Sequence, residues 1–312
     1  MYENLLKQIN KYNKITIFRH ERPDGDAMFS SLGLYYFLKD NFKDKQIKIC
    51  GNDIYDLVSR NDKVSDKFIL ESLAFVLDTS TSNRIDDFRS MAAKYIIKID
   101  HHPLVENYAD LDITKPESSS ASELLAEILL SKSFSKYKIS NKVCEYLYSG
   151  ILTDTINFRT TNTTSKTLLI ASKLVEKGNI KPAELVEYLF DTNLKTYKKV
   201  TEIRNKLNVK KGFGYIKLNR KDLEKLNMTP IQAKNNIDEI GTISELKIWA
   251  FAVENDGLWD CSIRSKKPYI INKIASKYNG GGHPNAAAVK KLKLTDLNKL
   301  FSELIEISTK KQ

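Results

Sequence analysis

Four short apolar runs, separated by segments with helical spacing, dominate the first hundred residues of this chain. They occupy residues 15–18, 47–50, 73–77 and 95–99. Strands this rich in apolar residues are typical of sheets buried on both faces, and their alternation with helical segments predicts a parallel α/β sheet. In such open sheets, ligands gather beyond the carboxyl ends of the strands. The residues that follow each run are therefore the first candidates for a functional site.

The chain is long enough for more than one domain. Its 312 residues exceed the roughly 250–300 at which one core usually stops growing. Further helices are predicted over residues 27–38, 120–130, 142–152, 164–177, 182–190, 268–278 and 297–307, and two further strands over 246–253 and 258–263. We therefore expect an N-terminal parallel-sheet domain over 1–190, a helical linker over 191–211, and a smaller mixed α/β domain over 212–312.

Composition excludes several classes of protein. No stretch approaches the roughly 18 apolar residues that a membrane-spanning helix needs. The three cysteines, Cys50, Cys144 and Cys261, are too scattered for a disulfide framework or a zinc knuckle. We expect a cytoplasmic protein without a membrane partner. The formal net charge of +11 is spread along the chain, so it predicts either a solvated surface or attraction of a polyanionic substrate.

Histidines and acidic residues gather where the predicted strands end. Each of them taken singly has an ordinary explanation, such as helix capping for Asp24 and Asp26. Together they form a carboxylate and imidazole set without thiolates, which suits Mn²⁺ best, with Mg²⁺ as the alternative. The set exceeds what one ion needs and predicts two ions about 3.5–4 Å apart that activate a water. Its members are His20, Asp24, Asp26, Asp78, Asp100, His101, His102 and Asp154.

A second group of candidates lies in the C-terminal part. Three consecutive glycines, Gly280 to Gly282, precede His283, and such a run lets backbone N–H groups approach a phosphate closely. A helix stop explains the first glycine but not the next two. Arg264 and Ser265 end a predicted strand, and the guanidinium suits a phosphate. Arg84 and Arg159 are weaker candidates for substrate contact.

These motifs resemble, in order, the signature motifs of the DHH phosphoesterase superfamily. The resemblance rests on His20 with Asp24-Gly25-Asp26, then Asp78, then Asp100-His101-His102, then Asp154. The run from Gly280 to Ala287 looks like the glycine-rich motif of the DHH-associated substrate-binding domain. The two-domain layout is similar to that of the nano-RNase and pAp-phosphatase group. Phe29 and Ala288 stand where the family commonly has glycine, which affects local loop shape.

The resemblance implies a role for each residue. His20 and Asp24 would bind one ion, and the other would be bound by Asp26, His101 and Asp154, with Asp78 bridging the two. Asp100 would orient His101, and His102 would contact the scissile phosphate or assist the leaving group, so the catalytic residues would be Asp78, Asp100 and His102. The substrate would be bound by Arg264, Ser265, Gly281, Gly282 and His283, with Arg84 and Arg159 as further contacts.

The resemblance also implies an activity. We expect a Mn²⁺-dependent 3′-to-5′ oligoribonuclease that releases 5′-mononucleotides from very short RNA and removes phosphate from adenosine 3′,5′-bisphosphate (pAp). Two alternatives stay open at this point: a cyclic-di-AMP or pApA phosphodiesterase, and a nucleotide-sensing module without turnover. Because the binding motifs would contact only one or two phosphates beside the scissile bond, short RNA and mononucleotide or dinucleotide phosphates are the expected partners, and long nucleic acid is not. A homodimer is a further expectation.

Overall fold

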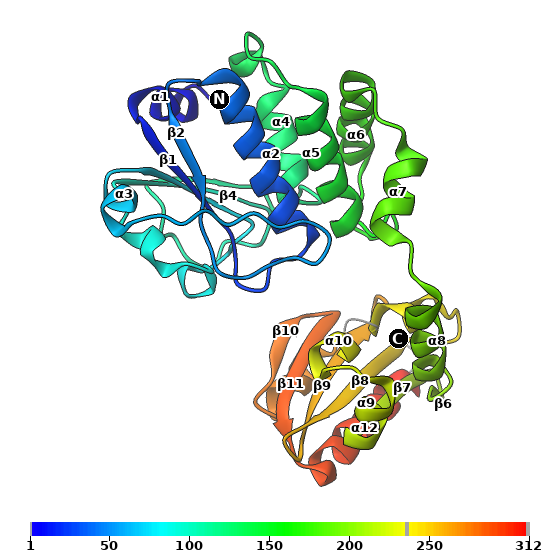
Figure 1. Cartoon of the computed structure of the whole chain (residues 1–312). Coiled ribbons are helices and arrows are strands. Elements are labelled where there is room, and N and C mark those ends of the chain that lie inside the picture. Colours follow the sequence, from blue (N-terminus) through cyan, green and yellow to red (C-terminus); the bar gives the residue numbers. More distant parts are fainter. Residues whose placement is uncertain (1, 235–236, 310–312) are drawn as a thin grey trace. The chain divides into compact units, whose positions relative to one another are not determined.

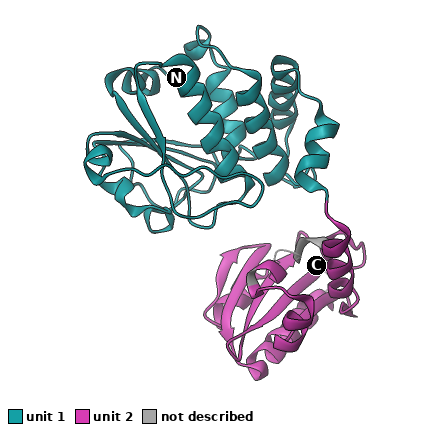
Figure 2. Cartoon of the chain, viewed as in Figure 1, with its two compact units in different colours: residues 1–191 teal, residues 192–312 magenta. Residues whose placement is uncertain are grey.

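The chain folds into two compact units, residues 1–191 and 192–312 (Figure 2). The computed structural model describes residues 2–234 and 237–309. Each unit has its own sheet and its own hydrophobic core. The α/β fold class predicted from the sequence is confirmed. Among the residues described, no helix combines the length and the apolar character needed to cross a membrane.

The first unit is built on a five-stranded sheet in which every neighbouring pair is parallel. Its spatial order is β2-β1-β3-β4-β5. The central strand β3 is buried along its whole length, as expected for a strand covered on both faces. The strands are β1 Lys14–Phe18, β2 Gln46–Ile49, β3 Leu73–Leu77, β4 Tyr95–Asp100 and β5 Leu111–Thr114.

The helices of the first unit include four neighbours, α2, α4, α5 and α6, that lie side by side (Figure 1). Helix α2 begins after Asp24, whose side chain accepts a hydrogen bond from the backbone of Ala27 and caps the helix. The helices are α1 Glu3–Lys11, α2 Gly25–Asn41, α3 Asp66–Leu70, α4 Ala121–Leu129, α5 Asn141–Asp154, α6 Ser165–Gly178 and α7 Pro182–Phe190, with short 3₁₀ turns η1 Ser82–Arg84, η2 Phe88–Ala92 and η3 Lys132–Phe134.

The four strands predicted in this unit are all present, to within a residue at each end. The sequence did not predict β5, because this edge strand is only partly buried and carries the polar residue Asp112. It also did not predict α1, which buries Leu5 and Ile9 on one face.

The second unit is built on a six-stranded mixed sheet with the order β10-β11-β9-β8-β7-β6. Only β7 and β8 pair in parallel; the other neighbours are antiparallel. Its strands are β6 Asn208–Lys210, β7 Phe213–Leu218, β8 Ile248–Asn255, β9 Leu258–Ser265, β10 Gly281–His283 and β11 Ala286–Leu292. Its helices are α8 Leu194–Arg204, α9 Arg220–Leu226, α10 Pro230–Lys234, α11 Asn272–Lys277 and α12 Leu294–Thr309, with the 3₁₀ turn η4 Ile237–Thr242.

Strand β8 packs against a core on each face of this sheet. Ile248, Ala250 and Ala252 lie in one core, and Trp249 and Phe251 lie in the other. This period of two follows from the pleat of a strand. Trp259, Cys261 and Ile263, which alternate along the neighbouring strand β9, belong to the first of these cores.

Two segments of the second unit differ from expectation. The run at 191–211, expected to be a helical linker, contains the helix α8 and also the strand β6, and its residue Ile203 is buried in one of the cores of the second unit. The helix predicted to begin at residue 268 begins at Asn272 instead. The preceding backbone is held elsewhere, because the Tyr269 carbonyl accepts a hydrogen bond from Ser265 and the Ile271 N–H donates to Pro284.

Candidate active site

The acidic and imidazole side chains of the first unit meet at the carboxyl edge of its sheet. His20 follows β1, Asp78 follows β3 directly, and His101 and His102 follow β4. Because all these strands are parallel, their carboxyl ends lie at one edge. The end of α5 contributes Asp154, and α2 contributes the remaining two carboxylates from its entrance.

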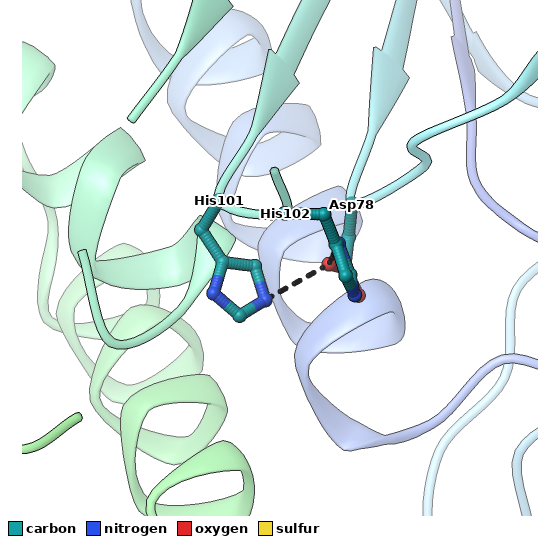
Figure 3. A group of neighbouring side chains, drawn as sticks. All are labelled: Asp78, His101 and His102. Atoms are coloured by element: carbon teal, nitrogen blue, oxygen red, sulfur yellow. Dashed lines mark ion pairs between the residues drawn. The ribbon is translucent and has the colours of Figure 1, made fainter. Parts of the chain in front are cut away.

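Asp78 lies at the centre of the cluster. One of its oxygens, Oδ2, is 3.5 Å from Nε2 of His20, and the other, Oδ1, is 3.4 Å from Nε2 of His101. Nδ1 of His102 is 3.5 Å from the same Oδ1 (Figure 3). Each carboxylate oxygen therefore faces a different imidazole, which is the placement that a bridging ligand requires.

Three overlapping sets of three residues lie at this carboxylate. His20, Asp24 and Asp78 form one set, Asp78, His101 and His102 form another, and Asp26, His101 and Asp154 form the third. Within each set, the candidate ligand atoms all lie within 4.8 Å of one another. Each set has the size and the oxygen and nitrogen chemistry to hold a divalent cation.

The close approach of α2 and α5 brings the third set together. A Cβ built on Gly25, the residue between Asp24 and Asp26, would lie 2.5 Å from Oγ1 of Thr153. Only glycine fits at that contact, and the next residue along α5 is Asp154. The glycine therefore allows carboxylates from two helices to reach one site.

Two histidine rings are oriented by backbone carbonyls. Nδ1 of His20 lies 2.8 Å from the carbonyl oxygen of Glu21, and Nδ1 of His101 lies 3.3 Å from that of Ser118. An Nδ1–H that donates to a carbonyl leaves Nε2 as the lone-pair nitrogen. In both rings this nitrogen faces Asp78, so each ring is ready to act as a ligand.

Asp26 is held by the beginning of a helix. Its Oδ2 accepts a hydrogen bond of 2.7 Å from the Ala121 N–H, and its Oδ1 accepts one of 2.9 Å from the Ser122 N–H. These are unpaired donors of the first turn of α4. The side chain is almost completely buried, so its orientation is determined by contacts with a segment 95 residues away.

The cluster perturbs the pKa values of its imidazoles. Burial lowers the pKa of His20, but hydrogen bonds and charges from Asp24 and Asp78 outweigh burial and raise it to about 10. Burial likewise opposes ionisation of His101, but Asp78 and other nearby carboxylates raise the pKa of this residue to about 10. Without a cation, the carboxylates hold these rings protonated.

The carboxylates are perturbed in opposite directions. Burial tends to raise the pKa of Asp78, but the two histidines outweigh it and lower this pKa below its ordinary value. Burial and neighbouring negative charges raise the pKa of Asp154 to about 7, although His101 opposes the rise. Burial, followed by the charges of Asp78 and Asp154, also raises the pKa of Asp26. Such an excess of buried negative charge is what a bound cation relieves.

The donor set fits a divalent metal. Oδ1 of Asp78 is buried and accepts no hydrogen bond from any residue described. A buried carboxylate oxygen without a donor is costly unless a cation satisfies it. Asp78 also adopts a left-handed backbone conformation, with φ of 52°, which aspartate tolerates better than most residues other than glycine.

Asp100 orients His102, not His101 as the resemblance implied. Its Oδ1 lies 2.8 Å from Nδ1 of His102 and 3.2 Å from the backbone nitrogen of the same residue. The physical reason is the alternation of side chains in extended chain, which places residues i and i+2 on the same side. Lys98, fully buried, lies 3.5 Å from the other oxygen of Asp100.

The sequence analysis missed a buried residue that supports this site. Arg19 lies between β1 and His20 and has no exposed surface. Its guanidinium donates to the carbonyl oxygens of Cys50 and Asp53 and to the side chain of Asn61. It thereby holds the loop after β2. The signal was present, because an arginine next to a buried apolar strand needs buried partners.

Two aspartates extend this support to the first ligand loop. Oδ2 of Asp86 accepts hydrogen bonds from the backbone nitrogens of Asn52 and Asp53. Oδ2 of Asp53 in turn accepts a hydrogen bond of 2.6 Å from the backbone nitrogen of Arg22, a residue with φ of 53°. The loop between His20 and the start of α2 is therefore held by a chain of side-chain to backbone contacts.

The two arginines proposed as weaker substrate contacts lie in the first unit. Arg84 ends the 3₁₀ turn η1, and its carbonyl accepts a hydrogen bond from the Glu21 N–H beside His20. Arg159 follows α5 by five residues. Both side chains are exposed, and neither is ion-paired with any residue that the structure describes.

The glycine-rich motif of the second unit forms an edge strand, β10, and not an open loop. Gly282 has φ of 135°, and a Cβ there would lie 2.3 Å from the carbonyl oxygen of Ala286, so strand pairing itself requires this glycine. A Cβ on Gly281 would meet nothing within 4 Å, which leaves that position open to a ligand. Gly281, Gly282 and His283 are all exposed.

Strand register places Arg264 and His283 in one row. Ala286 pairs with Arg264 on one side and with His283 on the other. Directly opposed residues of antiparallel strands share a face of the sheet. The two basic side chains therefore flank a small alanine. Ser265 is largely buried, and its hydroxyl bonds to Tyr269 and Asn285, so its contacts are structural.

Comparison with known proteins assigns a family to this fold and cluster. A model of the DHH family, N-terminal domain, matches residues 14–151, and a model of the DHHA1 domain matches residues 213–308. The chain is 35% identical over 307 residues to NrnA of Streptococcus mutans, and 33% identical over 311 residues to the bifunctional oligoribonuclease and PAP phosphatase NrnA of Bacillus subtilis. Each alignment covers 97% of both chains.

A solved structure agrees with these matches. The crystal structure of an exopolyphosphatase-related protein from Bacteroides fragilis is similar at a TM-score of 0.87 and 26% identity, covering 97% of this chain and 95% of that one. The fold and the motif matches together define a metal-dependent phosphoesterase. The chain belongs to the DHH family and carries a DHHA1 domain in its second unit.

Proposed function

We propose that this enzyme hydrolyses very short oligoribonucleotides to 5′-mononucleotides and dephosphorylates pAp, with two Mn²⁺ ions at the cluster around Asp78. The names of the NrnA relatives support this choice of substrates. We also propose that the enzyme acts in the cytoplasm, where RNA is degraded, and that Mg²⁺ is the alternative metal.

The central position of Asp78 carries the proposal. Its two oxygens face His20 and His101 at 3.5 and 3.4 Å, and candidate ligands lie on both sides of it, His20 and Asp24 on one side and Asp26, His101 and Asp154 on the other. A single ion would leave the ligands of one side without a function. The residues that would hold the ions are His20 and Asp24 on one side and Asp26, His101 and Asp154 on the other, with Asp78 shared.

When bound, the metals supply a water of lowered pKa and neutralise charge on the phosphoryl oxygens. The remaining work belongs to side chains of the protein. Asp100 fixes the ring of His102 through Nδ1, which leaves Nε2 available to a phosphate oxygen or to the leaving group. The side chain of His102 is about one-third exposed, so a substrate can reach it.

The second unit would bind a neighbouring phosphate or nucleotide. The row formed by Arg264, Ala286 and His283 supports this assignment, since two basic side chains lie on either side of a residue too small to fill the space between them. An arginine fork and an imidazole donor suit phosphate oxygens. Gly281 offers an unobstructed backbone beside them.

Two other functions compete with this one. The chain is 24% identical to a cyclic-di-AMP phosphodiesterase, GdpP of Geobacillus thermodenitrificans, but it covers only 46% of that longer protein. The same cluster would serve a cyclic-di-AMP or pApA phosphodiesterase. A nucleotide sensor without turnover is disfavoured, because binding alone does not require metal ligands on both sides of a shared carboxylate.

A substrate panel tests the proposal. Purified protein is supplied with Mn²⁺ and offered pAp, pApA, cyclic-di-AMP, RNA of two to five nucleotides and a 24-mer, with release of mononucleotide or phosphate as the readout. We expect the short RNAs and pAp to be the best substrates, and the short RNAs to outcompete the 24-mer. Activity should disappear with a chelator, return with Mn²⁺, and stay low with Ca²⁺, whose longer and looser coordination positions water badly.

The possible outcomes separate the candidates. Faster cleavage of cyclic-di-AMP than of pAp and dinucleotides would support the GdpP-like activity and contradict ours. Binding of these compounds with no turnover under any metal would support the sensor. Degradation of the 24-mer as fast as a trimer would contradict the restriction to short RNA. Light scattering on the same sample tests the expected homodimer.

A further inference from the structure

A hollow lined by lysines lies in the second unit, at the C-terminal end of β11, beyond the residues of β11 that pair with β10. Its volume is about 530 Å³. Five of its nine lining residues are lysines, whereas Asp296 is the single acidic one. We call it the lysine pocket; its lysines are Lys277, Lys290, Lys291, Lys293 and Lys299.

A β-bulge directs two of these lysines outward. Strand β11 pairs regularly with β9 as far as Val289, and then three residues of β11 span the distance covered by two residues of β9. Lys290 and Lys291 are therefore both exposed, although strict alternation would bury one of them. Lys291 adopts φ of 57°, in the left-handed region.

A buried carboxylate holds the bulge in place. Oδ1 of Asp260, on β9, accepts a hydrogen bond of 3.0 Å from the backbone nitrogen of Lys291. The other oxygen of Asp260 accepts one of 2.6 Å from Nζ of Lys234. Bulges often redirect side chains next to functional sites. The lysines therefore lie together because of this bulge, and not only because the surface is basic.

Most of the positive charge in the pocket is not neutralised. Lys277 pairs with Glu303 at 2.6 Å, and Lys299 lies 3.5 Å from Asp296. Within residues 2–234 and 237–309, no carboxylate lies within 4 Å of the ammonium groups of Lys290, Lys291 or Lys293. Converging ammonium groups repel one another, and a ligand with several negative charges relieves that repulsion.

The pocket adjoins the glycine strand along both β11 and the end of α11. Ala288 pairs with Gly281, and Lys290 follows two residues later, about 7 Å further along the strand. Tyr278 and Asn279 line the pocket and lead directly into Gly280. A chain of phosphates that begins at Gly281 would therefore reach the lysines with its next groups, and the ring of Tyr278 offers a surface for a base.

We propose that the lysine pocket binds the phosphates of an oligoribonucleotide beyond the one or two nearest the cleaved bond. This inference rests on the proposed oligoribonuclease function and specifies its substrate length: trinucleotides to pentanucleotides use the pocket, whereas pAp is too short to reach it. The ligand class is single-stranded RNA, recognised through its backbone and not through its sequence.

The test compares two triple variants with the same change in charge. Lys290, Lys291 and Lys293 are replaced by Gln in one variant. The other carries Gln at Lys195, Lys198 and Lys221, which are exposed lysines of the same unit outside the pocket. Binding of a labelled RNA pentamer is followed by fluorescence anisotropy at 50 and 200 mM salt, with Asp78→Asn added to each protein to prevent turnover. The KM for pAp and for the pentamer is measured without that change.

We expect the pocket variant alone to bind the pentamer about tenfold more weakly at low salt, with the KM for pAp unchanged. The affinity of wild-type protein for the pentamer should fall between 50 and 200 mM salt. If two to three phosphate contacts are lost, this fall should be roughly 7- to 18-fold smaller in the pocket variant. The inference is overturned if both variants bind the pentamer equally. It is also overturned if the KM of the pocket variant for pAp rises as much as its affinity for the pentamer falls. If the pentamer binds through the lysines but wild-type protein cleaves neither substrate, the proposed function fails while the binding site stands.

Discussion

Replacing Asp78 by Asn removes the charge that the ligands on its two sides share. The carboxylate is 98% buried, and its oxygens lie 3.4 to 3.5 Å from ring nitrogens on either side. One unit charge acting over about 4 Å at an effective dielectric constant of about 20 contributes about 4 kcal/mol. Since each 1.4 kcal/mol is a factor of ten, the affinity for a shared metal pair should fall by about a thousandfold, and kcat/KM for pAp should fall at least as far.

The measurements separate metal loss from unfolding. Metal content is determined by mass spectrometry after dialysis, kcat/KM is measured with pAp, and the Tm is followed by circular dichroism in chelator. The Tm of the metal-free variant should lie below that of the metal-free wild type while the folded spectrum is kept, because Asn leaves the imidazoles of His20 and His101 without the carboxylate that they share. Asp66→Asn, an exposed acid paired with Arg89, is the matched control. A variant that kept two ions and wild-type activity would refute the reasoning.

Three further predictions follow from the remaining contacts. Asp100→Asn should lower kcat about 10- to 100-fold with metal content unchanged, because a hydrogen bond to a charged group is worth about 1.5–3 kcal/mol and His102 loses its orientation. Kinetics and metal analysis check this, and the Tm reports the loss of charge beside the buried Lys98. Arg264→Ala and His283→Ala should each weaken substrate binding about tenfold to a hundredfold without metal loss, as titration calorimetry would measure. Gly282→Ala should lower the Tm, because its Cβ would lie 2.3 Å from a backbone oxygen.

Each of these predictions has a clear contrary result. Loss of metal in Asp100→Asn would mean that the carboxylate supports a ligand and not His102. Loss of metal in the Arg264 or His283 variant would contradict the separation of metal and substrate residues between the two units. A Gly282→Ala protein with an unchanged Tm would show that the edge strand β10 shifts at little cost in stability. Gly281→Ala is the matched control, because a Cβ at that position meets nothing within 4 Å.

Much of the catalytic unit could be predicted from the sequence because its signals are local. The buried strands are rich in apolar residues, and β3, a continuous apolar run, begins and ends at the predicted residues 73 and 77. Asp24 caps α2 as its position at a helix entrance indicates. Residues that follow parallel strands must meet at one edge, so placing His20, Asp78 and His101 near one another required only the strand pattern.

Other features depend on contacts that no local pattern specifies. The pairing of Asp100 with His102, and of His101 with the Ser118 carbonyl, was decided by the direction of each side chain after β4. The glycine motif forms the edge strand β10 because it pairs with β11, a contact that the glycine run itself does not specify. The bulge at Lys291 depends on a carboxylate 31 residues away, on another strand.

One physical reason separates the features that the sequence predicts from those that it does not. Periodicity, capping and apolar runs act between neighbours in the chain, so the sequence by itself determined β1 to β4, β8 and β9, most of the helices, and the edge at which the ligands gather. Orientation depends on which donor meets which acceptor after the chain has packed. The backbone of Ala121 holds Asp26 across 95 residues, and buried Arg19 reaches Asn61 across 42. Only the tertiary structure decided these contacts, because a buried polar group is satisfied by whatever partner the packing places beside it.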